Sequence, residues 1–303
     1  MNPAAVCGDL HLLLPGRVKV NEPLKEHTSW KIGGPADIFV EPAGRRELQI
    51  AVSYAHERGI PLTVIGNGTN LLVSDRGIRG IVVKIGRELG RVTVRDTEVT
   101  AEAGASLARV AAAAFKAGLA GFAFSAGIPG TVGGAVVMNA GAFGRCAGDV
   151  IRSVSVMGYD GILSRRTREE MNFRYRASAL QEEPAIVVDA VFALERGDPR
   201  QIYLDMKQYL ERRKGSHPLS LPNAGSVFKN PPGNPAGKII EQSGLKGLTV
   251  GGAQVSEKHA NFIVNLGGAK AEDVVRLIEQ VRAVVKKRFD LELETEVKLI
   301  GEW

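Results

Sequence analysis

Residues 125–144 (SAGIPGTVGGAVVMNAGAFG) constrain the fold more strongly than any other stretch, because glycine occupies six of these twenty positions. Internal glycines weaken helices and strands, whereas tight turns and close backbone contacts require them. A second stretch, VIGNGTNLLVSD at 64–75, leads from an apolar run into Gly-Asn-Gly-Thr-Asn. We therefore expect two tight loops at defined points of the fold.

These two glycine-rich loops also suggest a ligand. Without Cβ atoms, successive backbone N–H groups can point at one anion. One such loop could equally be a packing turn, but two of them, next to a strand or a small-residue helix, favour a pyrophosphate site. Neither is a standard nucleotide motif, because Leu71 replaces the third glycine of G-x-G-x-x-G and the chain contains no G-K-[ST].

Composition restricts the class of protein. A hydrophobic content of 44% with 24% charged residues is typical of a globular protein. The net charge is +6, but the basic residues are spread out without interleaved aromatics, which argues against nucleic acid. Only two cysteines are present, and neither a leader-like N-terminus nor a membrane-length apolar run is found, so we expect a cytoplasmic protein that does not bind membranes.

The order of the segments predicts an α+β protein. Helical periodicity and capping residues predict helices at 45–59, 106–116, 197–214, 235–243 and 271–289. Apolar runs predict strands at 36–42, 61–66, 80–85, 185–194, 261–265 and 294–300, and a hairpin at 91–104 that turns near Asp96. Changes of character along the chain divide it into three expected domains, at 1–85, 86–198 and 199–303.

The residues alone leave the chemistry open. The five histidines are scattered without a metal-binding motif, so we expect no metal site. Ser226, in NAGSVFKNPP, lacks the G-x-S-x-G elbow of a nucleophile, although His217 nine residues earlier keeps a hydrolase open. As a strand, NFRYRAS (172–178) would place Arg174 and Arg176 on one face, and the alternating glutamates of LELETEVKLIGEW would be the solvent face of a sheet.

Taken together, these segments resemble the UDP-N-acetylenolpyruvoylglucosamine reductases, the MurB family of flavoenzymes. TSWKIGGPAD, VIGNGTNLLV, AGIPGTVGGAVVMNAGAFG, NFRYRAS, NAGSVFKNP and GGAQVSEKHANFIVN occur in the family's order over nearly the whole chain. The resemblance implies a three-domain flavoprotein, with FAD held by the first two domains and substrate by the third. It also implies the shorter family subtype, which lacks a substrate-capping tyrosine loop.

The resemblance assigns roles to individual positions. It implies that Arg176, Ser226 and Glu296 are catalytic. The residues implied to bind substrate are Lys214, Asn223, Lys229, Asn230 and His259. The residues implied to bind FAD are Gly66, Asn67, Gly68, Thr69, Asn70, Leu71, Gly127, Ile128, Pro129, Gly130, Thr131, Gly133, Gly134, Ala135, Asn139, Ala140, Gly141 and Ala142.

The implied reaction reduces UDP-N-acetylglucosamine enolpyruvate to UDP-N-acetylmuramate, a step of peptidoglycan precursor synthesis. NADPH is the cosubstrate, FAD carries the hydride, and Ser226 gives the proton. The partner is thus a small nucleotide sugar, and we expect a monomer. Two alternatives remain open: another FAD-dependent oxidoreductase with the same FAD-binding architecture, and a nucleotide-sugar binding protein without turnover.

Overall fold

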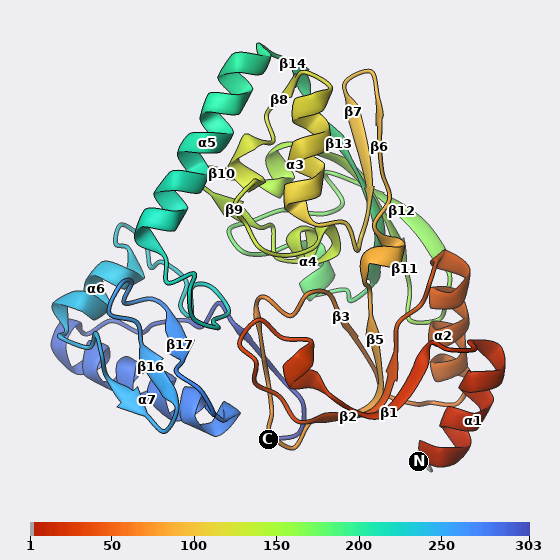
Figure 1. The fold of residues 1–303 in the computed structure, drawn as a ribbon, viewed down its shortest axis with the longest axis horizontal. Coiled ribbons are helices and arrows are strands. Elements are labelled where there is room, and N and C mark those ends of the chain that lie inside the picture. Colours follow the sequence, from red (N-terminus) through yellow and green to blue (C-terminus); the bar gives the residue numbers. More distant parts are fainter. Residues whose placement is uncertain (1–2) are drawn as a thin grey trace. The chain divides into compact units, whose positions relative to one another are not determined.

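The structure is a computed structural model that describes residues 3–303 (Figure 1). The chain divides into two compact units, each assembled from separate segments. Both expected domain boundaries, after residues 85 and 198, fall within unit 1, and the three-part division stays a prediction. Unit 1 comprises the chain up to Val20 with 38–67 and 80–213, and unit 2 comprises 21–37, 68–79 and 214–303.

The core of unit 1 is a five-stranded antiparallel sheet in the order β12-β11-β13-β7-β6. The hairpin turns as predicted, since Arg95 pairs with Glu98 and Asp96 between them has φ 51°. The central position of β13 explains its nearly continuous apolar sequence, because both of its faces are buried. The strands are β6 (Val92–Arg95), β7 (Glu98–Glu102), β11 (Ile151–Met157), β12 (Leu163–Thr167) and β13 (Ile186–Ala193).

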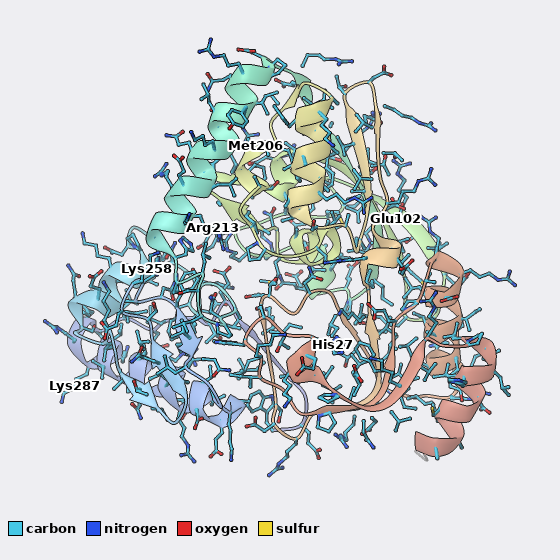
Figure 2. All side chains as sticks on the ribbon, in the orientation of Figure 1. His27, Glu102, Met206, Arg213, Lys258 and Lys287 are labelled. Atoms are coloured by element: carbon cyan, nitrogen blue, oxygen red, sulfur yellow. The ribbon has the colours of Figure 1, made fainter. Side chains whose placement is uncertain are left out.

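Helices with apolar faces pack on the core of unit 1. Ser106 caps α3, since its hydroxyl accepts a hydrogen bond from the Arg109 N–H at 3.2 Å. Ile202 of α5 is buried, and Met206 and Tyr209 pack against the same core, so these residues form the inner face of this helix (Figure 2 labels Met206). The helices are α1 (Pro3–Leu13), α2 (Arg45–Glu57), α3 (Leu107–Lys116), α4 (Val132–Val137) and α5 (Pro199–Ser216).

A second sheet has the order β1-β2-β5-β3. Within unit 1, β3 runs parallel to β5 with Ile65 opposite Lys84, so the first glycine-rich loop begins where β3 ends. The strands are β1 (Val18–Pro23), β2 (Pro35–Val40), β3 (Leu62–Ile65) and β5 (Ile78–Lys84). The short two-residue strands of unit 1 are β8 (Leu119–Ala120), β9 (Gly141–Ala142), β10 (Arg145–Cys146) and β14 (Glu195–Arg196).

Unit 2 packs helix α7 (Ala271–Phe289) against a three-stranded antiparallel sheet (Figure 1). The buried face of α7 carries apolar residues at helical spacing, including Val274, Leu277 and Val281. The indole N–H of Trp30 donates to the Ile263 carbonyl at 2.8 Å and thereby ties an early segment to this sheet. The other elements are β4 (Leu71–Val73), α6 (Ala236–Gln242), β15 (Thr249–Val250), β16 (Ala253–Val255), β17 (Ile263–Asn265) and β18 (Lys298–Ile300).

Two segments differ from the sequence-based expectation. Only β18 forms a ladder in the expected strand 294–300, where it pairs in parallel with β4, and Thr295 makes an isolated bridge to Phe228. Residues 172–178 form a turn and not a strand, because Arg176 has φ 56° and Arg174 pairs with Ala177. The shared-face expectation for Arg174 and Arg176 is therefore wrong.

Candidate active site

The two glycine-rich loops lie against each other in unit 1. A Cβ built on Gly66 would lie only 2.6 Å from the Thr131 hydroxyl oxygen, so a side chain at this position would displace the second loop. Thr131 is itself fixed, because it bridges to Ser106 and its hydroxyl accepts the Gly134 N–H at 3.4 Å. The close approach explains why glycine stands at the end of β3.

The backbone N–H groups of these loops fall into two sets. Those of Val132, Gly133 and Ala135 donate to protein carbonyls at 2.8–2.9 Å. Within residues 3–303, no acceptor pairs with the backbone N–H groups of Gly66, Asn67, Gly130 and Thr131. Unpaired N–H groups beside glycines form a cradle for an anion. This arrangement fits a pyrophosphate, and so the loops fit FAD.

A cavity of about 870 Å³ opens beside Asn67 in unit 1. This volume lies within the range of small-molecule and cofactor sites. Sequence reasoning missed most of its wall, which no motif marked. Its wall contains the glycines Gly86, Gly90 and Gly104, the cations Arg17, Lys19, Lys84, Arg87 and Arg109, and the acids Glu41 and Glu88.

Arg213 is a further residue near the glycine-rich loops that the sequence motifs did not single out. A Cβ on Gly127 would lie 3.0 Å from its Cδ, so the arginine stem packs on the second glycine-rich loop. Burial lowers the pKa of Arg213 from its ordinary value. The only sequence signal was the basic run ERRK at 211–214, in which Arg213 could not be told from its neighbours (Figure 2 labels Arg213).

The structure separates the two arginines of NFRYRAS. Arg174 is exposed and forms an ion pair with Glu182. Arg176 is half-buried, and its guanidinium carbon lies 5.1 Å from the centre of the Tyr175 ring. The predicted catalytic residue is therefore the less exposed of the two.

Ser226 and Glu296 lie on neighbouring backbone segments of unit 2. The Glu296 N–H donates to the Val227 carbonyl at 2.8 Å, and the Lys229 N–H donates to the Glu294 carbonyl at 2.8 Å. The Asn70 side-chain amide donates to the Glu296 carbonyl at 3.1 Å. These main-chain hydrogen bonds flank the isolated bridge between Phe228 and Thr295, and they bring together the segments of two predicted catalytic residues that are seventy positions apart in the chain.

The loop before Ser226 is shaped by Asn223. Its Oδ1 accepts the Gly225 N–H at 3.0 Å, and its Nδ2 donates to the Leu221 carbonyl at 2.8 Å. Gly225 has φ 77°, a conformation in which glycine is favoured. This turn, shaped by Asn223 and Gly225, ends at Ser226.

The other predicted substrate residues lie on the same unit. Lys229 forms an ion pair with Glu294, and the Asn230 side chain accepts the Ala236 N–H at 2.9 Å at the start of α6. Lys214 is exposed, and its carbonyl accepts a hydrogen bond from Lys258 at 2.7 Å.

His259 packs beside a second histidine. Its ring centre lies 5.4 Å from that of His217 and 4.8 Å from that of Phe262. Its Nδ1 accepts the Asn261 N–H at 3.2 Å. Burial, assisted by the nearby Lys246, lowers the pKa of His259, so the ring is neutral near pH 7.

Two kinds of feature are absent from the part of the chain that the structure describes. Residues 3–303 contain no cluster of three or more histidine, cysteine or acidic side chains that could hold a metal ion. Over the same range, no helix is long and apolar enough to cross a membrane.

Comparisons with known proteins agree with this geometry. Residues 36–165 match a family model described as an FAD binding domain, and residues 217–300 match the C-terminal domain of UDP-N-acetylenolpyruvoylglucosamine reductase. The chain is 47% identical to the UDP-N-acetylenolpyruvoylglucosamine reductase of Desulforamulus reducens, with 98% of both chains covered. It is 50% identical to that of Caldanaerobacter subterraneus subsp. tengcongensis, with 96% of both covered.

Solved structures show the same relationship. The crystal structure of UDP-N-acetylenolpyruvylglucosamine reductase (MurB) from Thermus caldophilus matches with a TM-score of 0.79 and 36% identity, covering 93% of this chain and 97% of that one. A glucose oxidase variant of Phl p 4 matches at a TM-score of 0.52 with 18% identity over 64% of this chain, which shows a shared fold alone. The full-length identity and the matched C-terminal domain place the chain in the UDP-N-acetylenolpyruvoylglucosamine reductase family, as an α+β, FAD-dependent oxidoreductase.

Proposed function

We propose that the chain reduces the enolpyruvyl group of UDP-N-acetylglucosamine enolpyruvate with NADPH and one proton, giving UDP-N-acetylmuramate and NADP⁺. Bound FAD would supply the hydride chemistry that links NADPH to the terminal carbon of the enolpyruvyl group. The chain's own residues bind and orient the substrate and manage its charge and proton.

The observation that carries this proposal is the pairing of the Ser226 and Glu296 segments in unit 2. The hydrogen bond from the Glu296 N–H to the Val227 carbonyl, at 2.8 Å, fixes a hydroxyl-bearing and a carboxyl-bearing residue on adjacent backbone segments. A reaction that adds a hydride to one carbon and a proton to the next requires a proton donor held in place. The main-chain hydrogen bonds between the Ser226 and Glu296 segments provide such rigidity.

Ser226 would donate the proton to the carbon next to the substrate carboxylate. Hydride addition leaves this carbon strongly basic, so an ordinary hydroxyl is acidic enough to protonate it. Because Ser226 acts here as a proton donor and not as a nucleophile, it needs no neighbouring histidine or carboxylate to activate it. The Asn223–Gly225 turn, which ends at this serine, holds the donor in place.

Arg176 and Glu296 would stabilise charge. Hydride addition pushes electrons into the substrate carboxylate, and a guanidinium held against that carboxylate stabilises the developing negative charge. A Glu296 carboxyl that keeps its proton can donate a further hydrogen bond to the same oxygen atoms.

The remaining predicted residues would bind the two nucleotides. The N–H groups of Gly66, Asn67, Gly130 and Thr131 suit the FAD pyrophosphate, and the cation-lined cavity beside Asn67 suits the rest of its adenosine diphosphate part. Lys214 and Lys229 suit the substrate's diphosphate. Glu294, which pairs with Lys229, is exposed, so phosphate oxygens can replace it at little cost.

Stopped-flow spectroscopy of the FAD-loaded Ser226→Ala variant tests the proposal. We expect NADPH to bleach the flavin at a near-normal rate, because that step does not use the serine. Reoxidation by the enolpyruvyl substrate should slow by about 10²- to 10⁴-fold, the usual loss when a proton donor is removed.

The exposed Ser220, six positions earlier, provides the matched control, and Ser220→Ala should leave both half-reactions unchanged. An equal loss in both half-reactions of Ser226→Ala would argue against the proton-donor role.

A further inference from the structure

The turn that carries Arg176 holds this residue in a conformation that arginine rarely adopts. Arg174 and Ala177 exchange backbone hydrogen bonds of 3.0 and 3.1 Å across the two residues between them. Arg176 occupies the second of these positions with φ 56°. This left-handed conformation is unfavourable for a residue with a Cβ atom, so the surroundings must hold it.

Gln181 holds the carbonyl of Arg176 itself. Its side-chain Nε2 donates to the Arg176 carbonyl at 3.1 Å and to the Val137 carbonyl at 3.0 Å. The Ser178 hydroxyl donates to the same Val137 carbonyl at 2.9 Å. Val137 is the last residue of α4, so these bonds tie the turn to the helix that the second glycine-rich loop contains.

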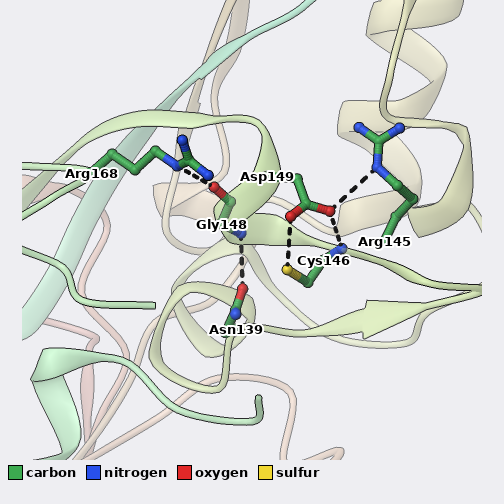
Figure 3. Close-up of polar contacts among 6 residues, drawn as sticks. All are labelled: Asn139, Arg145, Cys146, Gly148, Asp149 and Arg168. Atoms are coloured by element: carbon green, nitrogen blue, oxygen red, sulfur yellow. Dashed lines mark hydrogen bonds and ion pairs between the residues drawn. The ribbon is translucent and has the colours of Figure 1, made fainter. Parts of the chain in front are cut away.

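Asn139 ties the other end of the turn to the same loop. Its Nδ2 donates to the Arg174 carbonyl at 2.9 Å, and its Oδ1 accepts the Gly148 N–H at 2.8 Å (Figure 3). A Cβ on Gly148 would lie 2.7 Å from the Phe173 ring, so that ring packs directly on the glycine backbone. The turn is therefore held on both sides of Arg176.

We infer that Gln181 is a positioning residue for Arg176. This inference rests on the proposed role of Arg176 in stabilising charge on the substrate. The hydrogen bond from Gln181 fixes the peptide group that follows Arg176. Without it, the turn is free to relax to a negative φ at this residue, which redirects the Cα–Cβ bond and with it the guanidinium. On this inference, the effect of Gln181 on the reaction passes through Arg176, although its side chain also contacts the Val137 carbonyl and the Met138 Sδ.

Gln181→Met provides the test, because methionine keeps the length and volume of the side chain and removes its donor. In the FAD-loaded protein we expect NADPH to reduce the flavin normally, while reoxidation by the enolpyruvyl substrate slows by about 10- to 100-fold, as a misplacement of about 1 Å can cause. The loss should fall on kcat more than on KM, since the arginine acts on charge that develops in the transition state. The matched control is Glu182→Gln, an exposed neighbour, which should change neither rate more than about twofold.

A double-variant experiment separates positioning from a general structural effect. In an Arg176→Ala background, Gln181→Met should cause no further loss, because the group that it positions is absent. A further loss in the double variant would overturn the inference, as would unchanged reoxidation in Gln181→Met. If Arg176→Ala itself reoxidises normally, the proposed function of Arg176 fails. If reoxidation is slow in Arg176→Ala but normal in Gln181→Met, the positioning role of Gln181 is rejected and the proposed role of Arg176 stands.

Hydrogen exchange gives a readout that does not depend on activity. In Gln181→Met, the amides of Arg174 and Ala177, which close the turn, should exchange about tenfold faster, because the turn opens more often. The amides of the β6/β7 hairpin should keep their wild-type rates. Unchanged exchange at Arg174 and Ala177 would overturn the inference.

Discussion

The turn of Arg176 in unit 1 and the segment of Ser226 in unit 2 are held by different kinds of contact. Side-chain amides and a hydroxyl anchor the Arg176 turn, through Gln181, Asn139 and Ser178. Main-chain hydrogen bonds anchor the Ser226 segment, through the carbonyls of Val227 and Glu294. A point substitution can remove the side-chain hydrogen bonds of the Arg176 turn, but it leaves the main-chain hydrogen bonds of the Ser226 segment in place. The guanidinium position should therefore be easier to disturb than the hydroxyl position.

Asn261 is the exception in unit 2. Its Oδ1 accepts the Phe228 N–H at 2.9 Å, its Nδ2 donates to the Phe228 carbonyl at 2.8 Å, and its own carbonyl accepts the Val227 N–H at 2.8 Å. The side chain is buried, and it fixes Phe228 between Val227 and Lys229, whose main-chain groups bond Glu296 and Glu294. The Asn261 amide thus pairs with the N–H and the carbonyl of Phe228, which have no main-chain partners within residues 3–303.

The largest expected effect comes from breaking this contact. Asn261→Ala leaves the buried N–H and carbonyl of Phe228 without partners, at a cost of about 1–3 kcal/mol for each group. We expect the free energy of unfolding in urea to fall by about 2–5 kcal/mol. Asn223→Ala, which removes more exposed hydrogen bonds of the same loop, should cost about 1 kcal/mol or less. If both variants lose the same free energy of unfolding, the buried hydrogen bonds of Asn261 stabilise the protein no more than the exposed ones of Asn223.

A smaller effect is expected in the loops of unit 1, where the Gly66 backbone packs against the Thr131 side chain. Gly66→Ala places a methyl group 2.6 Å from the Thr131 hydroxyl oxygen, which should separate the loops and weaken FAD binding by about 10- to 100-fold. Fluorescence titration with FAD measures this loss.

The control for this loop variant is Gly8→Ala, at a helical position with open space around the glycine. Adding Thr131→Ala to Gly66→Ala should recover part of the FAD affinity. If the double variant binds FAD no better than Gly66→Ala, steric contact with Thr131 is not the cause of the loss.

The smallest expected effect concerns pH and sharpens the description of unit 2. Burial lowers the pKa of His259 in the folded protein below the ordinary histidine value of about 6.5. The unfolded chain therefore binds a proton at a higher pH than the folded one, and stability is lost as pH falls from about 6.5 through the folded pKa. His259→Gln should flatten this part of the curve of unfolding free energy against pH. An unchanged slope between pH 7 and 5 would show that other groups control it.

Local patterns predicted the regular elements well. The apolar face of 271–289 coincides with α7, and the helix expected at 106–116 is α3 with Ser106 as its cap, because helical periodicity acts over a few residues. The hairpin at Asp96 was likewise visible in the chain. The resemblance to a family, and not the local pattern, identified Ser226, Arg176 and Glu296 as candidates.

Long-range contacts explain what local patterns could not predict. The left-handed conformation of Arg176 depends on Gln181 and Asn139, whose partners no periodicity reveals. The alternation of LELETEV suggested a longer strand than β18, but only residues 298–300 have the neighbouring β4 for a ladder. The cavity wall of unit 1 comes from several separate segments, so no single motif marks it.

The discontinuous build of unit 2 has a consequence for protein synthesis. Trp30 bonds to a residue 233 positions later, and β4 receives its parallel partner only from residues 298–300. A ribosome must therefore deliver nearly the whole chain before residues 21–37 and 68–79 find their places. Until then, Trp30, Ile32 and Leu72 lack the residues from 224 onward that complete their core, and exposed apolar side chains make nascent chains aggregate or bind chaperones. Deletion of residues 298–303 should for this reason lower the yield of folded protein from a newly made chain, although these residues lie at its C-terminus.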